Sequence, residues 1–596
     1  MTLPIGREGR RLRRVALALL LCGCVICADA ADREWLRLQA PRFGVISQLD
    51  EDDTRRWAVE FDQFIDALHQ LYAVDELALP PLTMVLFKNS RDFEPYYLRT
   101  ETGQADIAGF FANMDAWSII GLAGLPGGSD RTRHVIYHEA VHWFASASEV
   151  EAPLWFQEGL AEVYSSFEVV GGKGRWGMAV QENVDYLSYY GLMPVEELLR
   201  ASQDEVLHGM DKYYPQAWAF VHYLMFGNLG AERPKLQAFL EQEQKTSLDT
   251  AFMNAFGQSY RDVTNDLRAY LKRGRYGIQE MEVRDRGAEM TIAPASAANV
   301  EASLARLAAA GRNGELARQH AEALLGVVPN NAVSYEILAI VADQAHDTAA
   351  LNAAVDKAIE LGSRDPNIYG VKASHLIEAN RRADAPVDEL LPPDVARTAA
   401  DLLGRSLALR PRSRDTVEHM MVALLNVDAV TEQDDAVLAA SGRALPTEGR
   451  VLVAQAAVAH RRDDVPRATE LLRRARTEPF TLPAGQRSMV GALHDSWFME
   501  WTLAELESLG PDRPDAAVAF LDAQLADDGV TGRPRSALEG IRADILSFER
   551  LRAAIEAREA GRAAEADAML AELVSDPNVS ERVRREAERF VAEENR

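Results

Sequence analysis

The chain has 596 residues, of which 47% are hydrophobic and 26% are charged, a composition that excludes a disordered chain or a membrane-embedded helix bundle. A chain of this length is too long to fold around a single hydrophobic core, so we expect about two to four domains. The formal net charge is −27 and no Lys/Arg-rich run follows residue 30. Such a surface repels phosphate backbones, so we expect no nucleic-acid partner.

Residues 1–30 have the pattern of an export signal. Five arginines between Arg7 and Arg14 precede an apolar run, and Ala28-Asp29-Ala30 has the small-x-small form of a cleavage site. We therefore expect a mature chain that is periplasmic or secreted and that has no transmembrane helix.

The three cysteines all lie in this signal, at Cys22, Cys24 and Cys27. The mature chain would then contain no thiolate for metal binding or nucleophilic catalysis. An alternative is that the signal ends in a lipobox, in which case a lipid on Cys24 would anchor the protein in the outer membrane.

The segment 31–280 combines strand and helix patterns. Extended stretches at 33–47, 81–88 and 116–124 alternate with helical periodicity at 52–72, in the helix after residue 130, and at 153–167, 213–227 and 260–272. This pattern predicts an α+β domain. A linker is expected at 281–296.

The segment 297–596 is rich in Ala, Leu, Arg and Glu and shows almost no strand pattern. "AGRNGELARQHAEALLGVVPNN" at 310–331 parallels "AGRAAEADAMLAELVSDPN" at 560–578, and prolines recur at intervals near the ~34 residues of tetratricopeptide repeats. We expect an all-α helical-repeat solenoid that is tetratricopeptide-like (TPR-like). A generic Ala-rich helical domain is the alternative.

The sequence "YHEAVHWF" at 137–144 contains an HExxH motif. On a helix His138 and His142 project from one face about one turn apart, so two imidazoles can bind one zinc ion. Glu139 points away from that line, where it can act on water without binding the metal. A solvated helix that carries two surface histidines is the alternative.

The next helix supplies carboxylates in "PLWFQEGLAEVY". A short reversal after His142 can return Glu158 to the metal, and a His, His, Glu set with one open position is typical of catalytic zinc. Glu162 follows one turn later on the same face. It can accept the second N–H of a ligand histidine and fix its tautomer.

These stretches resemble the HExxH…WLNEGFA segment of the aminopeptidase N family and the peptidase-MA-like domains of bacterial exported proteins, which are gluzincin-type metallopeptidases. The resemblance implies a zincin-like fold for 31–280, with His138, His142 and Glu158 as ligands of one Zn²⁺ and Glu139 as general base. The connection to the third ligand is shorter than in aminopeptidase N.

The stretch "YPQAWAFVHYL" at 214–224 is similar to the helix whose tyrosine stabilises the tetrahedral intermediate in that family. The resemblance gives this role to Tyr214, with Tyr213 and His222 as alternatives. The GAMEN segment of the exopeptidases has no counterpart, so endopeptidase and exopeptidase action both stay open.

We therefore expect an exported zinc peptidase in which Glu139 activates a zinc-bound water to hydrolyse a peptide bond. The helical repeats would offer a surface to a protein or peptide partner. The alternative is a catalytically inactive, peptidase-like platform that acts through its repeats.

Overall fold

The computed structural model describes residues 35–594, apart from 72–78, 101–102, 105–108, 115, 125–129, 146–151, 203–204, 207–210, 244–245 and 528. The expected export signal at 1–30 lies outside the described residues. The chain divides into two compact units, Met1–Ile368 and Tyr369–Arg596. Across the part of the chain that is described, no helix combines the length and the apolar character needed to cross a membrane.

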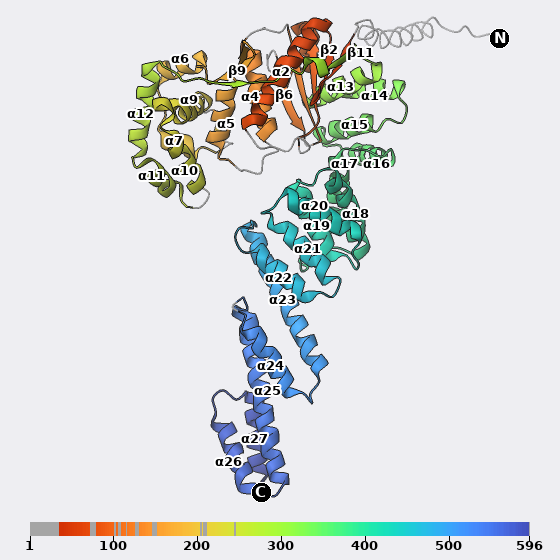
Figure 1. Cartoon of the computed structure of the whole chain (residues 1–596). Coiled ribbons are helices and arrows are strands. Elements are labelled where there is room, and N and C mark those ends of the chain that lie inside the picture. The colour runs from red at the N-terminus through yellow and green to blue at the C-terminus, as the bar shows by residue number, and fades with distance from the viewer. Residues whose placement is uncertain are drawn as a thin grey trace, which may run out of the picture. The chain divides into compact units, whose positions relative to one another are not determined.

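A six-stranded mixed sheet forms the centre of the first unit (Figure 1). Its order is β11-β1-β2-β3-β7-β6, in which β2, β3 and β7 are parallel and the other neighbours are antiparallel. The strands are β1 Leu36–Gln39, β2 Phe43–Ser47, β3 Leu82–Phe87, β6 Gly109–Met114, β7 Trp117–Ala123 and β11 Thr291–Pro294. The expected extended stretches at 33–47, 81–88 and 116–124 are thus confirmed.

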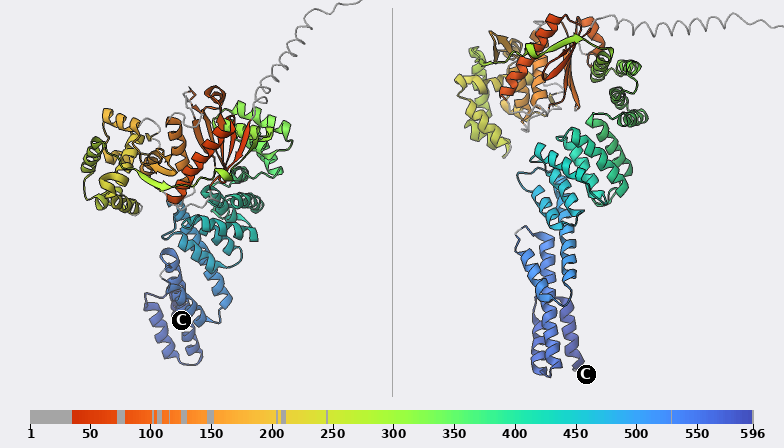
Figure 2. Two further views of the ribbon diagram at one scale, coloured as in Figure 1. Left: turned by 45° about the horizontal axis from the view of Figure 1, so that its top comes forward. Right: turned by 45° about the vertical axis from the view of Figure 1, so that its right-hand side comes forward.

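The two faces of this sheet are both buried. Along β3, Met84 and Leu86 point to one face while Val85 and Phe87 point to the other, as the two-residue period of a strand requires. Helices α2 (Glu51–Leu71) and α4 (Asp130–Ala145) cover the first face. Helices α3 (Ser90–Phe93) and α13 (Ala297–Ala310) cover the second, and Figure 2 shows the sheet between the two helical layers.

Helix α13 packs directly on the sheet because Gly121 of β7 has no side chain. A Cβ atom at this position would lie 2.7 Å from Cδ1 of Leu307 and 2.9 Å from Cε2 of Phe93. The following turn is tied to the same unit by a hydrogen bond of 2.9 Å from Asn313 Nδ2 to the carbonyl of Pro95. The first helices of the all-helical segment therefore belong to the first unit: α13, α14 (Gly314–Val327), α15 (Ala332–Gln344) and α16 (Thr348–Glu360).

The segment 281–296, which we expected to be a linker, contains strand β11, and β11 pairs with β1. The change from mixed to all-helical structure does occur at Ala297. The two compact units, however, divide between Ile368 and Tyr369. The composition of the chain changes at the start of α13, whereas the boundary between the compact units follows four helices later.

The remainder of the first unit is mainly helical, and it confirms the expected helices at 153–167, 213–227 and 260–272. The helices are α5 Leu154–Tyr164, α6 Gln181–Tyr190, α7 Val195–Arg200, α9 Tyr213–Phe226, α10 Arg233–Glu243, α11 Leu248–Phe256 and α12 Tyr260–Arg273. Five short strands complete the unit: β4 Arg99–Thr100, β5 Gly103–Gln104, β8 Glu168–Val170, β9 Lys173–Trp176 and β10 Gln279–Glu282.

Helices α5 and α9 approach each other closely at Gly159. A Cβ atom there would overlap the carbonyl oxygen of Ala217 and would lie 2.5 Å from Cγ2 of Val221. The obstacle is the backbone of α9, which cannot rotate aside as a side chain can. This contact fixes the position of Glu158, the preceding residue of α5.

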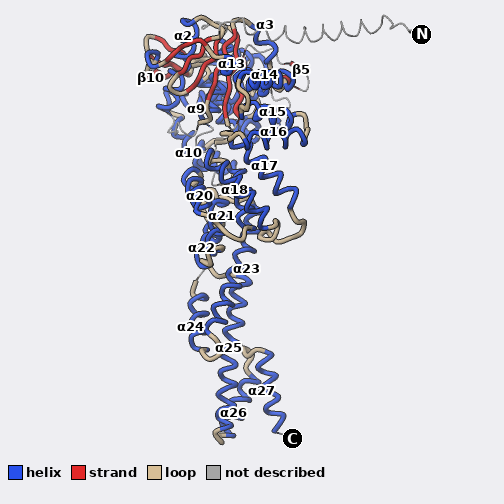
Figure 3. Tube along the Cα trace, turned by 90° about the vertical axis from the view of Figure 1, so that its right-hand side faces the viewer, coloured by secondary structure: helices blue, strands red, loops and turns tan. Residues whose placement is uncertain are grey.

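The second unit contains helices only among its described residues, and all the strands drawn in Figure 3 belong to the first unit. Neighbouring helices pack in pairs, such as α18 with α19, α21 with α22 and α25 with α26. A mixed sheet followed by an all-helical stretch is therefore confirmed. The helices are α17 Pro366–Asn380, α18 Pro393–Leu409, α19 Arg414–Asn426, α20 Glu432–Ala444, α21 Gly449–His460, α22 Val465–Ala475, α23 Ala484–Leu509, α24 Pro514–Leu525, α25 Gly532–Glu559, α26 Ala563–Ser575 and α27 Glu581–Glu594.

Replacing Gly159 by Ala should destabilise the first unit by about 1–3 kcal/mol, because the added methyl group overlaps backbone atoms of α9. Gly326→Ala is the matched control. Gly326 lies in α14, and a Cβ there has no neighbour within 4 Å. The control should stabilise the helix by about 0.5–1 kcal/mol. Urea denaturation measures both changes, and equal effects of the two substitutions would contradict the close approach of α5 and α9.

Candidate metal centre

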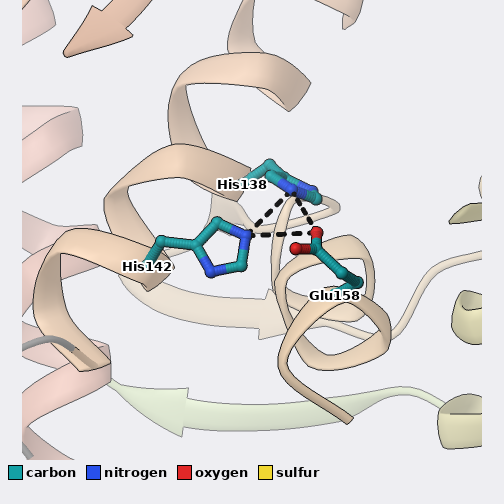
Figure 4. A group of neighbouring side chains, drawn as sticks. All are labelled: His138, His142 and Glu158. Atoms are coloured by element: carbon teal, nitrogen blue, oxygen red, sulfur yellow. Dashed lines mark hydrogen bonds and ion pairs between the residues drawn. The ribbon is translucent and has the colours of Figure 1, made fainter. Parts of the chain in front are cut away.

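Three side chains that suit a divalent metal ion converge between α4 and α5 (Figure 4). His138 and His142 stand one turn apart on α4, and Glu158 faces them from α5. The two Nε2 atoms are 3.1 Å apart. Oε2 of Glu158 lies 3.2 Å from Nε2 of His138 and 3.3 Å from Nε2 of His142.

These distances are close to those that tetrahedral zinc requires. Bonds of about 2.0–2.2 Å to nitrogen and oxygen, set at tetrahedral angles, place neighbouring ligand atoms about 3.3–3.6 Å apart. The three atoms outline one face of such a tetrahedron. Two imidazoles and one carboxylate leave a fourth position open, as catalytic zinc sites do and closed structural sites do not.

The electrostatics of the cluster favour a positive charge at its centre. Burial lowers the pKa of His138, but its contacts with Glu158 and Glu162 outweigh burial and raise the pKa to about 10. Burial raises the pKa of Glu158, but contacts with His138 and His142 bring it down to about 2. His138 therefore binds a proton more readily than a free imidazole does.

Glu162 lies behind His138, as expected for a residue that orients a ligand. Its Oε1 is 3.1 Å from Nδ1 of His138, although the angle of approach is poor for a hydrogen bond. Burial raises the pKa of Glu162, but its contacts with His134 and His138 lower the pKa further than burial raises it. Glu162 is therefore a buried, ionised carboxylate under the cluster.

Two partners of Glu162 were missed by the sequence analysis. Nε2 of His134 lies 3.3 Å from Oε1 of Glu162, and Nδ2 of Asn183 donates to Oε2 at 2.8 Å. Nδ1 of His134 in turn lies 2.8 Å from the hydroxyl of Ser165. A signal for His134 was present in "HVIYHEAVH", where a third histidine stands one turn before His138. Asn183 comes from α6 and has no comparable sequence signal.

Glu139 contributes no ligand atom to the cluster, which consists of the other three residues. It is half-buried. Its charge acts on both His138 and Tyr214, and in each case it raises the pKa. Glu139 thus lies within electrostatic range of one ligand and of the tyrosine that faces it.

Tyr214 lies against the cluster. Its ring centroid is 6.1 Å from that of His138 in an edge-to-face arrangement, and 37% of the residue is exposed. Burial and then the charges of Glu158, Glu139 and Glu162 raise the pKa of Tyr214 to about 12. The phenol therefore keeps its proton at neutral pH and can donate it in a hydrogen bond.

The two alternatives to Tyr214 have other surroundings. Tyr213 is fully buried, and its hydroxyl has no hydrogen-bond partner among the described residues. Both ring nitrogens of His222 are engaged, one with the hydroxyl of Tyr270 at 2.8 Å and one with the carbonyl of Gly177 at 2.7 Å. Burial lowers the pKa of His222 to about 4. His222 is a neutral core residue outside the cluster.

Comparison with known protein families finds none that matches the chain, and no curated protein matches it in sequence. The chemistry of the candidate metal centre is therefore inferred from the residues of this chain alone.

The purified protein should bind about one zinc ion per chain, because three suitable ligand atoms converge. His138→Ala and Glu158→Gln should each lower the zinc content after dialysis to well under half of that value, since the first removes a ligand and the second replaces a carboxylate ligand by a neutral, weakly binding amide. His419→Ala, which removes a half-buried histidine on α19 far from the three ligands in sequence, is the matched control. Elemental analysis measures all four proteins. Full zinc content in either ligand variant would refute the ligand assignment.

Zinc affinity should increase with pH, because zinc competes with the proton that His138 holds below its pKa of about 10. Glu158, with a pKa of about 2, stays ionised. Between about pH 7 and 9 the apparent affinity should rise about tenfold per pH unit, with about one proton released per zinc bound. Calorimetry in two buffers of different ionisation enthalpy measures this release.

The raised pKa of His138 also predicts how the stability of the zinc-free protein changes with pH. The stabilising contribution of His138 is fully present below its ordinary pKa of about 6.5 and is lost as the pH rises towards 10.

Glu162→Gln is the control for the proton release that accompanies zinc binding. It removes a carboxylate that raises the pKa of His138, so it should reduce the proton release at pH 8. Release that is near zero in the parent would contradict the assignment.

Proposed function

We propose that the first unit is a zinc-dependent peptidase of the gluzincin type, with a zincin-like catalytic domain. The observation that carries the proposal is the convergence of Nε2 of His138, Nε2 of His142 and Oε2 of Glu158 within 3.1–3.3 Å of one another. A bound zinc ion would polarise the scissile carbonyl and lower the pKa of an attacking water.

Glu139 is the proposed general base. It follows His138 on α4 and contributes no ligand atom, so its carboxylate is available to take a proton from the attacking water. The same group would return the proton to the leaving amine. A positioned acid–base group of this kind contributes about 10²–10⁴-fold to a rate.

Tyr214 is the proposed oxyanion donor. Its ring faces His138 and its phenol is partly exposed, so the hydroxyl can reach a substrate that approaches the open ligand position. The raised pKa keeps the donor proton in place at neutral pH. A hydrogen bond to charge that develops on the carbonyl oxygen stabilises the transition state.

Glu162 and His134 would orient the site rather than take part in the reaction. The buried carboxylate of Glu162 fixes the ring of His138 from behind, and partners of this kind increase the basicity of a ligand imidazole. Asn183 and His134 hold that carboxylate in place.

The all-helical stretch would act as a TPR-like surface for a protein or peptide partner, and residues 1–30 would direct export. The helices of the second unit vary in length, from 11 residues in α22 to 28 in α25, so any repeat is irregular. The alternative function is an inactive platform that binds partners through these helices.

Glu139→Gln should keep the zinc content and the fold, and it should lower peptide hydrolysis by at least about 10²–10⁴-fold, because it removes the proton acceptor but no ligand. Tyr214→Phe should lower the rate by about 10²-fold, since it removes one oxyanion donor. Cleavage of a broad peptide and protein panel, followed by mass spectrometry, gives these rates.

Tyr213→Phe is the matched control for Tyr214→Phe. The hydroxyl of Tyr213 is buried without a described partner, so its removal should leave the turnover number within about twofold of the parent. Unchanged hydrolysis in Glu139→Gln would assign the activity to another site. A parent that holds zinc and cleaves nothing in the panel would favour the binding platform.

A further inference from the structure

A pocket of about 390 Å³ lies between the central sheet and helix α13, and none of its lining residues belongs to the metal cluster. The starts of β2 and β3 form its floor and α13 forms a wall. Gly44 of β2 explains the space. It shares a sheet face with Ile46, which packs towards α13, and a Cβ at Gly44 would have no neighbour within 4 Å.

The pocket is positively charged in a chain whose net charge is −27. Arg37, Arg42 and Arg306 line it, and none of its described lining residues is acidic. Arg42 is neutralised by Asp62 at 3.5 Å and Asp66 at 3.9 Å. Neither Arg37 nor Arg306 has a carboxylate partner among the described residues.

Of these two arginines, Arg306 is the less exposed to solvent. Its Nε is buried and has no hydrogen-bond partner among the described residues. The guanidinium lies over the ring of Trp117, with its central carbon 5.4 Å from the ring centroid. Stacking fixes the direction of the guanidinium but leaves its Nε–H without a hydrogen bond.

The surroundings of Arg306 favour an anion beside it. Burial lowers the pKa of Arg306, and the charges of Glu336 and Asp365 only partly oppose this effect. Those two carboxylates form their own hydrogen bonds, Glu336 with Ser363 and Asp365 with the amide of Asn367. A half-buried guanidinium whose Nε–H has no partner is less stable than one that is paired with an anion.

Neutral donors lie on the same side of α13. Asn299 and Ser303 line the pocket one turn apart, and Arg306 follows at the next helical step. Residues three and four apart share a helix face, so one stripe of α13 offers an amide, a hydroxyl and a guanidinium. Arg37 faces this stripe from β1, because it shares the sheet face of Trp35, which packs towards α13.

We propose that this pocket, named here the α13 pocket, binds a small oxyanion through a phosphate or carboxylate group held between Arg37 and Arg306. A guanidinium fork matches either group with two parallel hydrogen bonds. The proposal does not depend on zinc or on peptidase activity.

The experiment titrates the full chain with inorganic phosphate and with succinate, at constant ionic strength maintained with sodium chloride. Melting temperature and calorimetry are the readouts. We expect saturable binding of at least one anion and a rise of about 2–5 °C at ten times its dissociation constant. Phosphate without succinate assigns a phosphate group, and the reverse result assigns a carboxylate.

Two variants and one control locate the site. Arg306→Met and Arg37→Gln should weaken the dissociation constant at least tenfold. In anion-free buffer Arg306→Met should melt at a higher temperature than the parent, because a half-buried charge without a carboxylate in contact is replaced by an apolar side chain that still packs on Trp117. Arg318→Gln removes an exposed arginine from α14 and should bind the anion as the parent does.

Three outcomes overturn the proposal. The first is a parent that binds neither anion. The second is a variant pair, Arg306→Met and Arg37→Gln, that binds as tightly as Arg318→Gln. The third is binding that disappears in Glu158→Gln, since the anion would then be a ligand of the metal centre. Failure of the proposed peptidase activity leaves this titration unaffected.

Discussion

The candidate metal centre depends on the short helix α5. This helix contacts α4 through charged side chains and contacts α9 at a glycine, where no side chain intervenes. Glu158 and Glu162 stand one turn apart and face His138 on α4. Gly159 faces the backbone of α9. Because α5 is held this closely between the two helices, Glu158 meets the histidines while Tyr214 of α9 lies over the ring of His138. A shift of α5 would disturb the ligands and the proposed oxyanion donor together.

The local part of this site could be predicted from sequence. The spacing of His138 and His142 on a helix fixes their common face, and Glu158 with Glu162 repeats that spacing on the next helix. The non-local part could not be predicted in this way. Asn183 reaches Glu162 from α6, and the choice among Tyr213, Tyr214 and His222 depends on which face of α9 is buried. Helical periodicity in an almost wholly apolar helix does not define that face.

The boundary between the compact units is a second feature that could not be predicted from local sequence patterns. Composition changes at Ala297, where strand patterns cease. Packing does not change there, because β11 pairs with β1 and α13 covers the sheet over Gly121. The pairing of Leu36 with Pro294 joins residues that are more than two hundred positions apart. Contacts of that sequence separation leave no periodic signal, since each partner reads locally as an ordinary short strand.

The candidate metal centre favours a positive charge, whereas the α13 pocket favours a negative one. The two sites also differ in whether their own residues can adjust the charge. At the metal cluster the carboxylates of Glu158 and Glu162 surround His138, and the imidazole can take up a proton when no cation is bound. In the α13 pocket, Arg306 cannot change its charge in this way. A guanidinium stays charged at neutral pH even where burial lowers its pKa, as it does for Arg306. Arg306 cannot remove its own charge by losing a proton, and the charges of Glu336 and Asp365 offset its burial only in part, so the proposed anion would supply the remaining balance.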